Sequence, residues 1–308
     1  MSRPRAVVFA YHDVGVRCLK TLLSADVEVP LVVTVPDDPH ETRWYQSVAA
    51  SAAEYGLQCV APVEANTPEL ERRVAALQPD FLFSFYYRAM LGDALLGSAR
   101  RGALNMHGSL LPKYRGRAPV NWAILRGERE TGATLHYMVA RADAGDIVDR
   151  QAVPILIDDD AREVFAKVTV AAELVLARSL PGLIAGTAPR SPQPLLAGEY
   201  FGRRRPQDGR IDWSRSATEI HDLVRAVAPP FPGAFGTVGG ARWEIQRTRL
   251  TRRHAPAGAP RLFAAAGSCW LALADGSVLQ LLAAATPQGP LDLSARAAEL
   301  GTHTLPLS

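Results

Sequence analysis

The sequence of 308 residues contains only three cysteines and no long uncharged apolar run. Cys18, Cys59 and Cys269 are far apart, odd in number and without metal-ligand spacing, so neither a disulfide framework nor a zinc site is expected. No apolar stretch reaches the roughly 18 uncharged residues of a membrane span, and His12 and Asp13 come too early for a signal peptide. These absences predict a cytoplasmic protein without a metal and without membrane insertion.

Motifs of two common enzyme classes are also missing. The stretch YHDVG, residues 11–15, lacks the G-x-G-x-x-G phosphate fingerprint, which counts against a nicotinamide enzyme. Ser109 has no G-x-S-x-G context, which counts against a serine hydrolase. Lysine is scarce, because only Lys20, Lys113 and Lys167 stand among the 34 basic residues, and the net charge of +3 is mild. The overall charge therefore gives no sign of a nucleic-acid-binding surface.

Short apolar runs alternate with segments of helical periodicity in the first part of the chain. Residues 14–23 and 45–55 have the helical spacing. The runs expected to be strands are residues 5–10, 29–35, 58–61, 81–85 and 103–106. Such alternation is typical of α/β proteins, so we expect a Rossmann-like, mostly parallel sheet with helices on both faces.

Further elements predict where this first domain ends. Residues 133–139 and 147–155 are expected to be neighbouring strands, joined by the turn RADAGD. Asp160 and Glu163 form a capping box that opens a long amphipathic helix through about residue 183. The first domain is accordingly expected over residues 1–186.

The texture of the sequence changes after Gly186. Residues 187–210 are rich in Pro, Gly and Arg without periodicity, which predicts a linker. Residues 211–308 then contain one helical segment and several short strand-like runs, at residues 217–227, 242–247, 268–273 and 278–282. This pattern predicts a small C-terminal β-barrel domain, OB-like in type.

The stretch NMHGSLLPKYRGRAP, residues 105–119, directly follows the fifth expected strand. Ligand sites in open α/β sheets lie at the carboxyl ends of strands, and alternation along the strand directs Asn105 and His107 to the same side. An Asn amide can donate to a developing oxyanion, and a His can carry a proton at neutral pH. The alternative is a turn in which both side chains satisfy backbone groups.

Asp143 favours the catalytic interpretation. It lies in RADAGDI, a turn between two strands expected in the same sheet, where it can approach His107 and favour the imidazolium. An Asn, a His and an Asp at adjacent strand ends suit acyl transfer without a protein nucleophile.

These motifs resemble those of a known family. HGSLLPKYRGRAP with the preceding Asn105, the ADAGDI turn and GRIDW (residues 209–213) resemble the 10-formyltetrahydrofolate-dependent formyltransferases over essentially the whole chain. FSFYYR (83–88), NWAILRGERETGATLH (121–136) and VRAVAPPFPGAF (224–235) are similar to the formyltransferase half of the bifunctional polymyxin-resistance proteins of lipid A modification. Those proteins formylate UDP-4-amino-4-deoxy-L-arabinose.

The resemblance implies a role for each site residue. It makes His107 the proton-transferring acid/base, Asn105 the stabiliser of the tetrahedral oxyanion, and Asp143 the carboxylate that tunes His107. It also implies a 10-formyltetrahydrofolate pocket lined by Ala89, Met90, Leu91, Arg117, Val139, Ala140, Arg141, Ala142 and Asp143, several of them through backbone groups. Without the family, Ala89 and Met90 would indicate packing at a helix start, and Arg117 a surface turn.

Four further residues are expected to contact the acceptor. Tyr11 and His12, at the end of the first strand, face the same region and can reach an acceptor sugar, although a lone His there is more often solvated. Arg203 and Arg204 can bind a diphosphate as an Arg fork, although a run of charges is usually a solvated face.

Two classes of acceptor compete. A tRNA needs a basic path for its phosphates, but the loop after the second strand, PDDPHET, carries Asp37, Asp38 and Glu41. We therefore expect a small nucleotide sugar as the partner, UDP-4-amino-4-deoxy-L-arabinose first among them, and no nucleic acid. Methionyl-tRNA formyltransferase and formyltetrahydrofolate hydrolase remain the alternatives, the latter because water can take the place of the amine.

Overall fold

The computed structural model describes residues 3–36 and 43–308, which form two compact units. The first unit comprises Met1–Pro119, Glu130–Pro154 and Phe165–Gly202, and the second comprises Val120–Arg129, Ile155–Val164 and Arg203–Ser308. The acidic residues Asp37, Asp38 and Glu41, which favoured a small acceptor, lie outside the described residues. The two units are described in turn.

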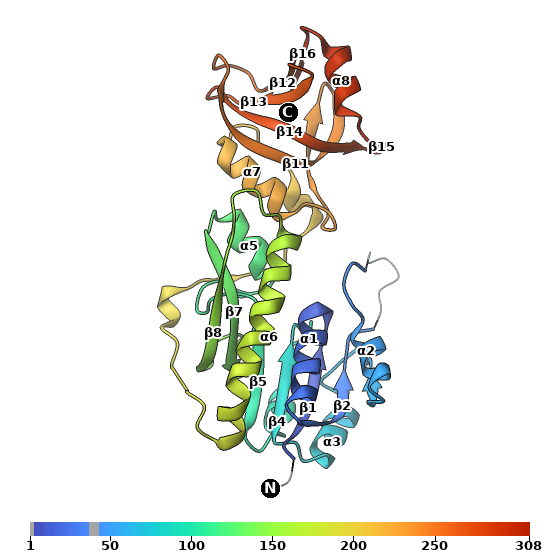
Figure 1. Cartoon of the computed structure of the whole chain (residues 1–308), viewed down its shortest axis with the longest axis vertical. Coiled ribbons are helices and arrows are strands. Elements are labelled where there is room, and N and C mark those ends of the chain that lie inside the picture. Colours follow the sequence, from blue (N-terminus) through green and yellow to red (C-terminus); the bar gives the residue numbers. More distant parts are fainter. Residues whose placement is uncertain (1–2, 37–42) are drawn as a thin grey trace. The chain divides into compact units, whose positions relative to one another are not determined.

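The first unit is built on a seven-stranded sheet with the strand order β3-β2-β1-β4-β5-β7-β8 (Figure 1). The strands are β1 (Arg5–Ala10), β2 (Glu28–Val33), β3 (Cys59–Val60), β4 (Phe81–Phe85), β5 (Gly102–His107), β7 (Glu130–Tyr137) and β8 (Ile147–Pro154). The first five are parallel to one another, β7 is antiparallel to β5, and β8 is antiparallel to β7. The expected Rossmann-like, mostly parallel sheet is confirmed.

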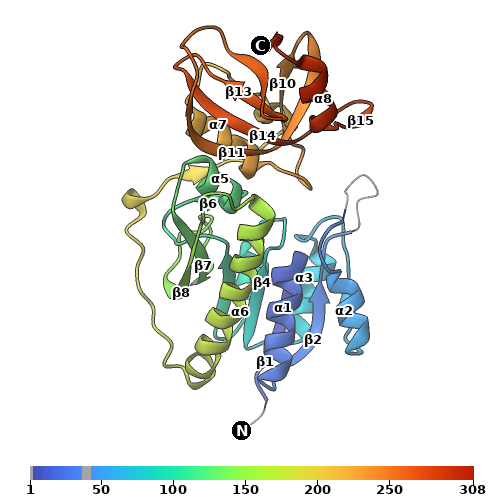
Figure 2. The same ribbon diagram turned by 45° about the horizontal axis from the view of Figure 1, so that its top comes forward.

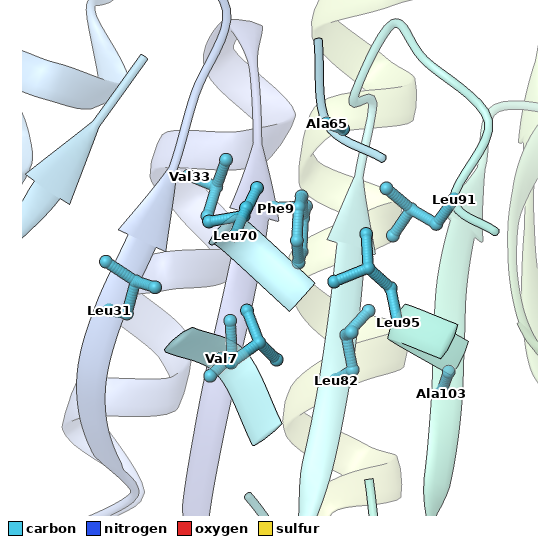
Figure 3. Close-up of a cluster of buried hydrophobic side chains, with 11 residues drawn as sticks. Val7, Phe9, Leu31, Val33, Ala65, Leu70, Leu82, Leu91, Leu95 and Ala103 are labelled. Atoms are coloured by element: carbon cyan, nitrogen blue, oxygen red, sulfur yellow. The ribbon is translucent and has the colours of Figure 1, made fainter. Parts of the chain in front are cut away.

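Apolar side chains cover both faces of this sheet because the central strands are buried along their length. On one face, Val7, Phe9 and Leu82 pack against Leu70 of α3 (Pro68–Ala76) and Leu95 of α4 (Asp93–Leu96) (Figure 3). The other face is covered by α1 (His12–Ser24) and α6 (Ala161–Ala185), and α2 (Val48–Glu54) lies beside α1. The sheet is therefore a buried scaffold that fixes the ends of its strands.

Helix α6 begins where the sequence predicts it. The amide of Asp160 donates to Glu163 Oε2 and the amide of Glu163 donates to Asp160 Oδ1, both at 2.9 Å, which is the expected capping box. Among the described residues, α6 alone is long and apolar enough to span a membrane by length and composition. Half of its apolar stretch is buried in the structure, as in a core helix, so this is weak evidence for a membrane segment.

Residues 187–202, which were expected to be part of a linker, are bound along the first unit. Ser191 pairs with Ile147 at the start of β8, and β9 (Tyr200–Phe201) pairs in parallel with β6 (Arg115–Gly116). Figure 2 shows this segment in yellow beside β8. Backbone hydrogen bonds hold it, and these leave no periodicity in the sequence. A short 3₁₀ helix, Leu195–Ala197, lies in its middle.

The second unit contains an antiparallel sheet of the order β10-β11-β14-β13-β12-β16 that curls into a half-barrel (Figure 2). Its strands are β10 (Ala234–Val238), β11 (Ala241–His254), β12 (Arg261–Ala265), β13 (Ser268–Ala272), β14 (Ser277–Thr286), β15 (Gly289–Pro290) and β16 (Thr304–Pro306). Its helices are α7 (Ala217–Ala226) and α8 (Leu293–Leu300), with a 3₁₀ turn at Pro206–Gly209, and α5 (Pro119–Leu125) belongs to this unit from Val120 onward. The expected OB-like C-terminal domain is confirmed.

Candidate active site

Asn105 and His107 lie at the C-terminal end of β5, two residues apart. This strand is parallel to β4 and antiparallel to β7, so that Asn105 lies opposite His136 and His107 lies opposite Thr134. Alternate residues of a strand share a face, and Asn105, His107 and His136 therefore project from the same side of the sheet. His107 and His136 are buried, and Asn105 is half-buried.

The three side chains converge on one carboxylate oxygen. Oδ1 of Asp143 lies 3.4 Å from Asn105 Nδ2, 3.6 Å from His107 Nδ1 and 3.5 Å from His136 Nε2. The other oxygen, Oδ2, accepts a hydrogen bond of 2.8 Å from the backbone amide of Gly116. The expected meeting of Asn105, His107 and Asp143 is thus present in the geometry.

The environment of Asp143 favours its ionised form. Burial alone would raise the pKa of this carboxyl, but the imidazole of His107 and the amide of Gly116 hold its pKa well below the usual range. Asp143 also has a left-handed backbone, with φ +51°, which Asp adopts more readily than most residues. The site therefore contains a fixed, buried anion.

His107 has one ring nitrogen in a hydrogen bond and the other beside Asp143. Its Nε2 lies 2.8 Å from the carbonyl oxygen of Tyr114, and because a carbonyl can only accept, Nε2 carries a proton. Its Nδ1 faces Asp143, with Oδ1 at 3.6 Å. Nδ1 is therefore the ring nitrogen that can take up or release a proton, and it lies beside Asp143.

His136 is a site residue that the sequence analysis missed. Its Nδ1 donates to the carbonyl of Tyr137 at 2.8 Å, which leaves Nε2 to accept from Asn105 Nδ2 at 3.1 Å. The Asn105 amide is thereby oriented by His136 and Asp143 together. A His within an apolar strand usually indicates a satisfied core residue, but its position opposite Asn105 was a usable signal once β5 and β7 were paired.

A tyrosine packs against the backbone just beyond His107. A Cβ on Gly108 would overlap the Tyr86 hydroxyl, so only glycine leaves room for this ring. The Tyr86 hydroxyl is buried and has no hydrogen-bond partner among the described residues, and burial raises its pKa above the usual range. The Tyr86 ring also contacts Phe165 of α6, with ring centroids 5.3 Å apart.

The residues expected to hold the folate lie in three loops of the first unit. Leu91 is buried in the core, whereas Ala89 and Met90 are exposed, and Asn66 bonds both the Met90 carbonyl (2.8 Å) and the Gly92 amide (2.7 Å). Arg117 is exposed and donates to the carbonyl of Arg88 at 3.3 Å.

Residues 139–143 form the turn that carries Asp143. In this turn Val139, Ala140 and Arg141 are exposed and Ala142 is half-buried. A pocket of about 340 Å³ adjoins it and is lined by residues including Gly102, Met138, Val139, Gly145 and Arg190. Of the residues expected to hold the folate, Val139 lines this pocket.

Tyr11 and His12 belong to an aromatic cluster. The imidazole of His12 stacks on Tyr45 with centroids 4.0 Å apart and contacts Trp44 (4.6 Å) and Phe165 (4.3 Å). The hydroxyls of Tyr11 and Tyr45 are hydrogen-bonded. Both His12 and Tyr11 are buried, so the simple alternative of a solvated His12 is wrong.

Arg203 and Arg204 differ in their surroundings within the second unit. Arg203 is exposed. The guanidinium of Arg204 lies over the Trp122 ring, 4.9 Å from its centroid, and donates to the carbonyl of Asp208 at 2.9 Å. Partial burial lowers the pKa of Arg204, and the nearby Asp208 opposes this shift. The two cations therefore do not form a free fork in this structure.

The described residues also form a second pocket, and they contain no group of metal-binding side chains. A second pocket, of about 530 Å³, lies in the second unit between residues 210–214, Pro260, Ala274 and Ser308, and none of the expected site residues lines it. No group of three or more His, Cys, Asp or Glu residues suited to a metal ion occurs within residues 3–36 and 43–308.

The fold and this site define a two-domain α/β protein with an Asn, His and Asp at adjacent strand ends. The chain matches the model of the formyl transferase family over residues 9–180, and the model of the formyl transferase C-terminal domain over residues 204–284. The first match covers more than half of the chain. This protein belongs to the formyl transferase family.

Solved structures with the same fold include several formyltransferases. An N-formyltransferase from Helicobacter canadensis, in complex with folinic acid and dTDP-3-aminofucose, is 20% identical with a TM-score of 0.72, over 91% of this chain and 99% of that one. WlaRD, a sugar 3N-formyltransferase determined with dTDP and 5-N-formyl-THF, is 18% identical with a TM-score of 0.72, over 95% and 99%. A 4-N-formyltransferase from Francisella tularensis is 19% identical with a TM-score of 0.61, over 75% and 91%.

Proposed function

We propose that this protein transfers a formyl group from 10-formyltetrahydrofolate to the amine of a nucleotide-linked amino sugar. The observation that carries the proposal is the convergence of Asn105, His107 and His136 on Asp143 Oδ1 within 3.6 Å, in a chain of the formyl transferase family. No serine or cysteine nucleophile is part of this cluster, and direct attack by the acceptor amine needs none.

Each side chain has a distinct part in the proposed reaction. The amine nitrogen bonds to the formyl carbon, and the bond from that carbon to the folate nitrogen breaks. The Asn105 amide keeps one N–H on His136 and exchanges its longer, 3.4 Å contact with Asp143 Oδ1 for the formyl oxygen, where it stabilises the negative charge that develops. His107 moves the proton from the attacking amine toward the leaving nitrogen, and Asp143 stabilises the charged state of its imidazole.

The folate is proposed to bind beside the turn that carries Asp143. The pocket next to Val139 and Gly145 supports this, as do the exposed Ala89 and Met90 and the exposed residues 139–141. Leu91 would contribute through its backbone, because its side chain is part of the core. Two of the structural neighbours were determined with folinic acid or 5-N-formyl-THF, which supports a folate donor.

The acceptor is proposed to be a nucleotide sugar, with UDP-4-amino-4-deoxy-L-arabinose as the first candidate. The sugar N-formyltransferases among the neighbours support the class of acceptor, and the H. canadensis enzyme was determined with a dTDP-linked 3-amino sugar. The base and the position of the amine are therefore both variables of the test. Tyr11, His12, Arg203 and Arg204 remain the residues proposed to contact this acceptor.

A substrate panel tests the proposal. Purified protein is given 10-formyltetrahydrofolate with UDP-4-amino-4-deoxy-L-arabinose, with 3-amino and 4-amino sugars on dTDP, with methionyl-tRNA, or with no acceptor. Mass spectrometry measures the formylated product, and absorbance measures the release of tetrahydrofolate. We expect formylation of a nucleotide sugar. Preferential formylation of methionyl-tRNA, or tetrahydrofolate release that needs no acceptor, would replace the proposal with the corresponding alternative.

A further inference from the structure

The segment of residues 191–201, here called the strap, is attached to the loops that hold the site residues. At its start, Ser191 exchanges two backbone hydrogen bonds with Ile147, of 2.8 and 2.9 Å. At its end, the amide of Arg117 donates to the Phe201 carbonyl at 2.9 Å, and β9 pairs with β6. The strap therefore spans from the turn of Asp143 to the loop of Gly116 within one compact unit.

Gln193 binds the turn of Asp143 directly. Its Nε2 donates to two backbone carbonyls, that of Asp143 at 3.1 Å and that of Gly145 at 2.6 Å. Asp143 has a left-handed backbone, so its conformation depends on such contacts more than that of an ordinary residue. By fixing the carbonyl of Asp143, Gln193 fixes the direction in which the carboxylate leaves the main chain.

The other end of the strap fixes the partners of the same carboxylate. Gly116 donates its amide to Asp143 Oδ2, and with φ +100° and its Cα close to the Phe201 carbonyl it has no room for a side chain. Buried Arg115 donates from Nη2 to the carbonyl of Gly198 at 3.0 Å. The ring of Tyr114, whose carbonyl holds His107, stacks on Phe201 with centroids 5.0 Å apart.

We propose, on the basis of the proposed function, that Gln193 is a positioning residue for Asp143 and that the strap is part of the active-site framework. Gln193 does not contact the reacting atoms in this proposal. It acts by holding Asp143 Oδ1 within reach of Asn105 and His107, and a displacement of the order of 1 Å there is enough to slow catalysis markedly.

The hydrogen bonds of Gln193 argue against a purely stabilising role. Its Oε1 is buried and has no hydrogen-bond partner within the described part of the chain. A buried acceptor without a partner lowers the stability of the folded state, so this side chain is poorly suited to a role in fold stability alone. What its donors do achieve is to bring the carbonyls of Asp143 and Gly145 to a common point.

The first experiment compares Gln193→Met with a matched control. Methionine keeps the length of the side chain and removes both N–H donors. The control is Gln151→Met, because Gln151 also donates to a backbone carbonyl of the same unit, that of Ala152 at 3.1 Å, but is on β8 and not in contact with the turn. We expect kcat of Gln193→Met to fall by about 10-fold with little change in either KM, and Gln151→Met to match the wild type.

A double-mutant cycle then separates positioning from stability. If Gln193 acts through Asp143, Gln193→Met should have little further effect on kcat in a chain that already carries Asp143→Asn. A residue that only stabilises the fold would lower kcat by the same factor in both backgrounds. Equal factors in the two backgrounds, or a wild-type kcat in Gln193→Met, would overturn the proposal.

Hydrogen exchange distinguishes failure of the positioning role of Gln193 from failure of the proposed function. If the wild type formylates no acceptor, the proposed function fails, but exchange of the amides in residues 139–147 still reports on the contact. We expect these amides to exchange faster in Gln193→Met than in Gln151→Met, and equal rates would overturn the positioning role. Should Gln193→Met not fold, Gln193→Glu, which also lacks the N–H donors, takes its place in every measurement.

Discussion

The backbone amide of Gly116 donates a hydrogen bond of 2.8 Å to Oδ2 of Asp143 and leaves Oδ1 to the catalytic side chains. A carboxylate that is anchored by the main chain through one oxygen has little freedom to turn the other away. Oδ1 accordingly faces Asn105 and His107 at 3.4 and 3.6 Å. The anion is thus part of the rigid framework of the site, and its ionisation is coupled to the stability of the fold.

The first prediction concerns acid unfolding. The pKa of Asp143 is lowered by folding, against the opposing effect of burial, so its carboxylate stabilises the folded state fully above about pH 4, the ordinary pKa of Asp. This stabilisation is lost as the pH falls from there toward the lowered pKa. The urea midpoint of the wild type should therefore fall more steeply between about pH 4 and 2 than that of Asp143→Asn. Asp146→Asn, on the same turn, controls for the loss of one carboxylate.

The second prediction concerns the two residues at the end of β5. His107→Ala removes the proton carrier and Asn105→Ala removes an oxyanion donor, and each should lower turnover by on the order of 10²-fold or more. Because Asn105 is only half-buried, the fold of Asn105→Ala should stay intact by circular dichroism. Near-normal turnover in either variant would remove that residue from the catalytic set.

The third prediction concerns His136. Its Nε2 accepts from Asn105 Nδ2 at 3.1 Å, so His136→Ala releases the amide and should lower kcat by about 10-fold with less effect on the folate KM. His136→Gln offers an oxygen that can replace Nε2 as an acceptor, and it should keep more of the activity than His136→Ala. The same kcat in both variants would mean that the bond to Asn105 has no catalytic consequence.

Much of the fold follows from local patterns in the sequence, but the site follows only in part. The runs of β1 and β4 and the capping box at Asp160 are signals that act over a few residues, and the structure has them where they were expected. Asn105 and His107 could be singled out because they follow one such run. His136 could not, because its meaning depends on its pairing across the sheet with Asn105.

The strap was harder still to foresee from the sequence. Its attachments are backbone hydrogen bonds from Ser191 and Phe201 and the side chain of Gln193. None of these has a period or a composition of its own, and Pro and Gly in the same stretch are typical of a free linker. The contacts join residues that are far apart in the sequence, such as Gln193 and Asp143, so they are a property of the tertiary structure.

The fourth prediction concerns stability. The buried hydroxyl of Tyr86 has no hydrogen-bond partner among the described residues, and such a group costs about 1–3 kcal/mol. Tyr86→Phe removes the oxygen and keeps the ring against Phe165, so the melting temperature should rise by at least about 2 °C. A fall would show that the hydroxyl is satisfied in solution. Tyr55→Phe, at an exposed position on the same unit, should leave the melting temperature unchanged.

The last prediction separates a nucleotide sugar from a tRNA by salt and by competition. A tRNA engages several phosphates at once, so its affinity should fall steeply with salt, roughly in proportion to the number of contacts. A nucleotide sugar carries one diphosphate, and we expect a shallow salt dependence of its KM together with competitive inhibition by free UDP. Titrations of UDP and of unacylated tRNA at low and high salt measure both effects. If UDP does not inhibit while tRNA competes at low salt and is released at high salt, the acceptor is a tRNA. The reason is that the affinity of a polynucleotide, which makes several phosphate contacts, falls far more steeply with salt than that of a single diphosphate.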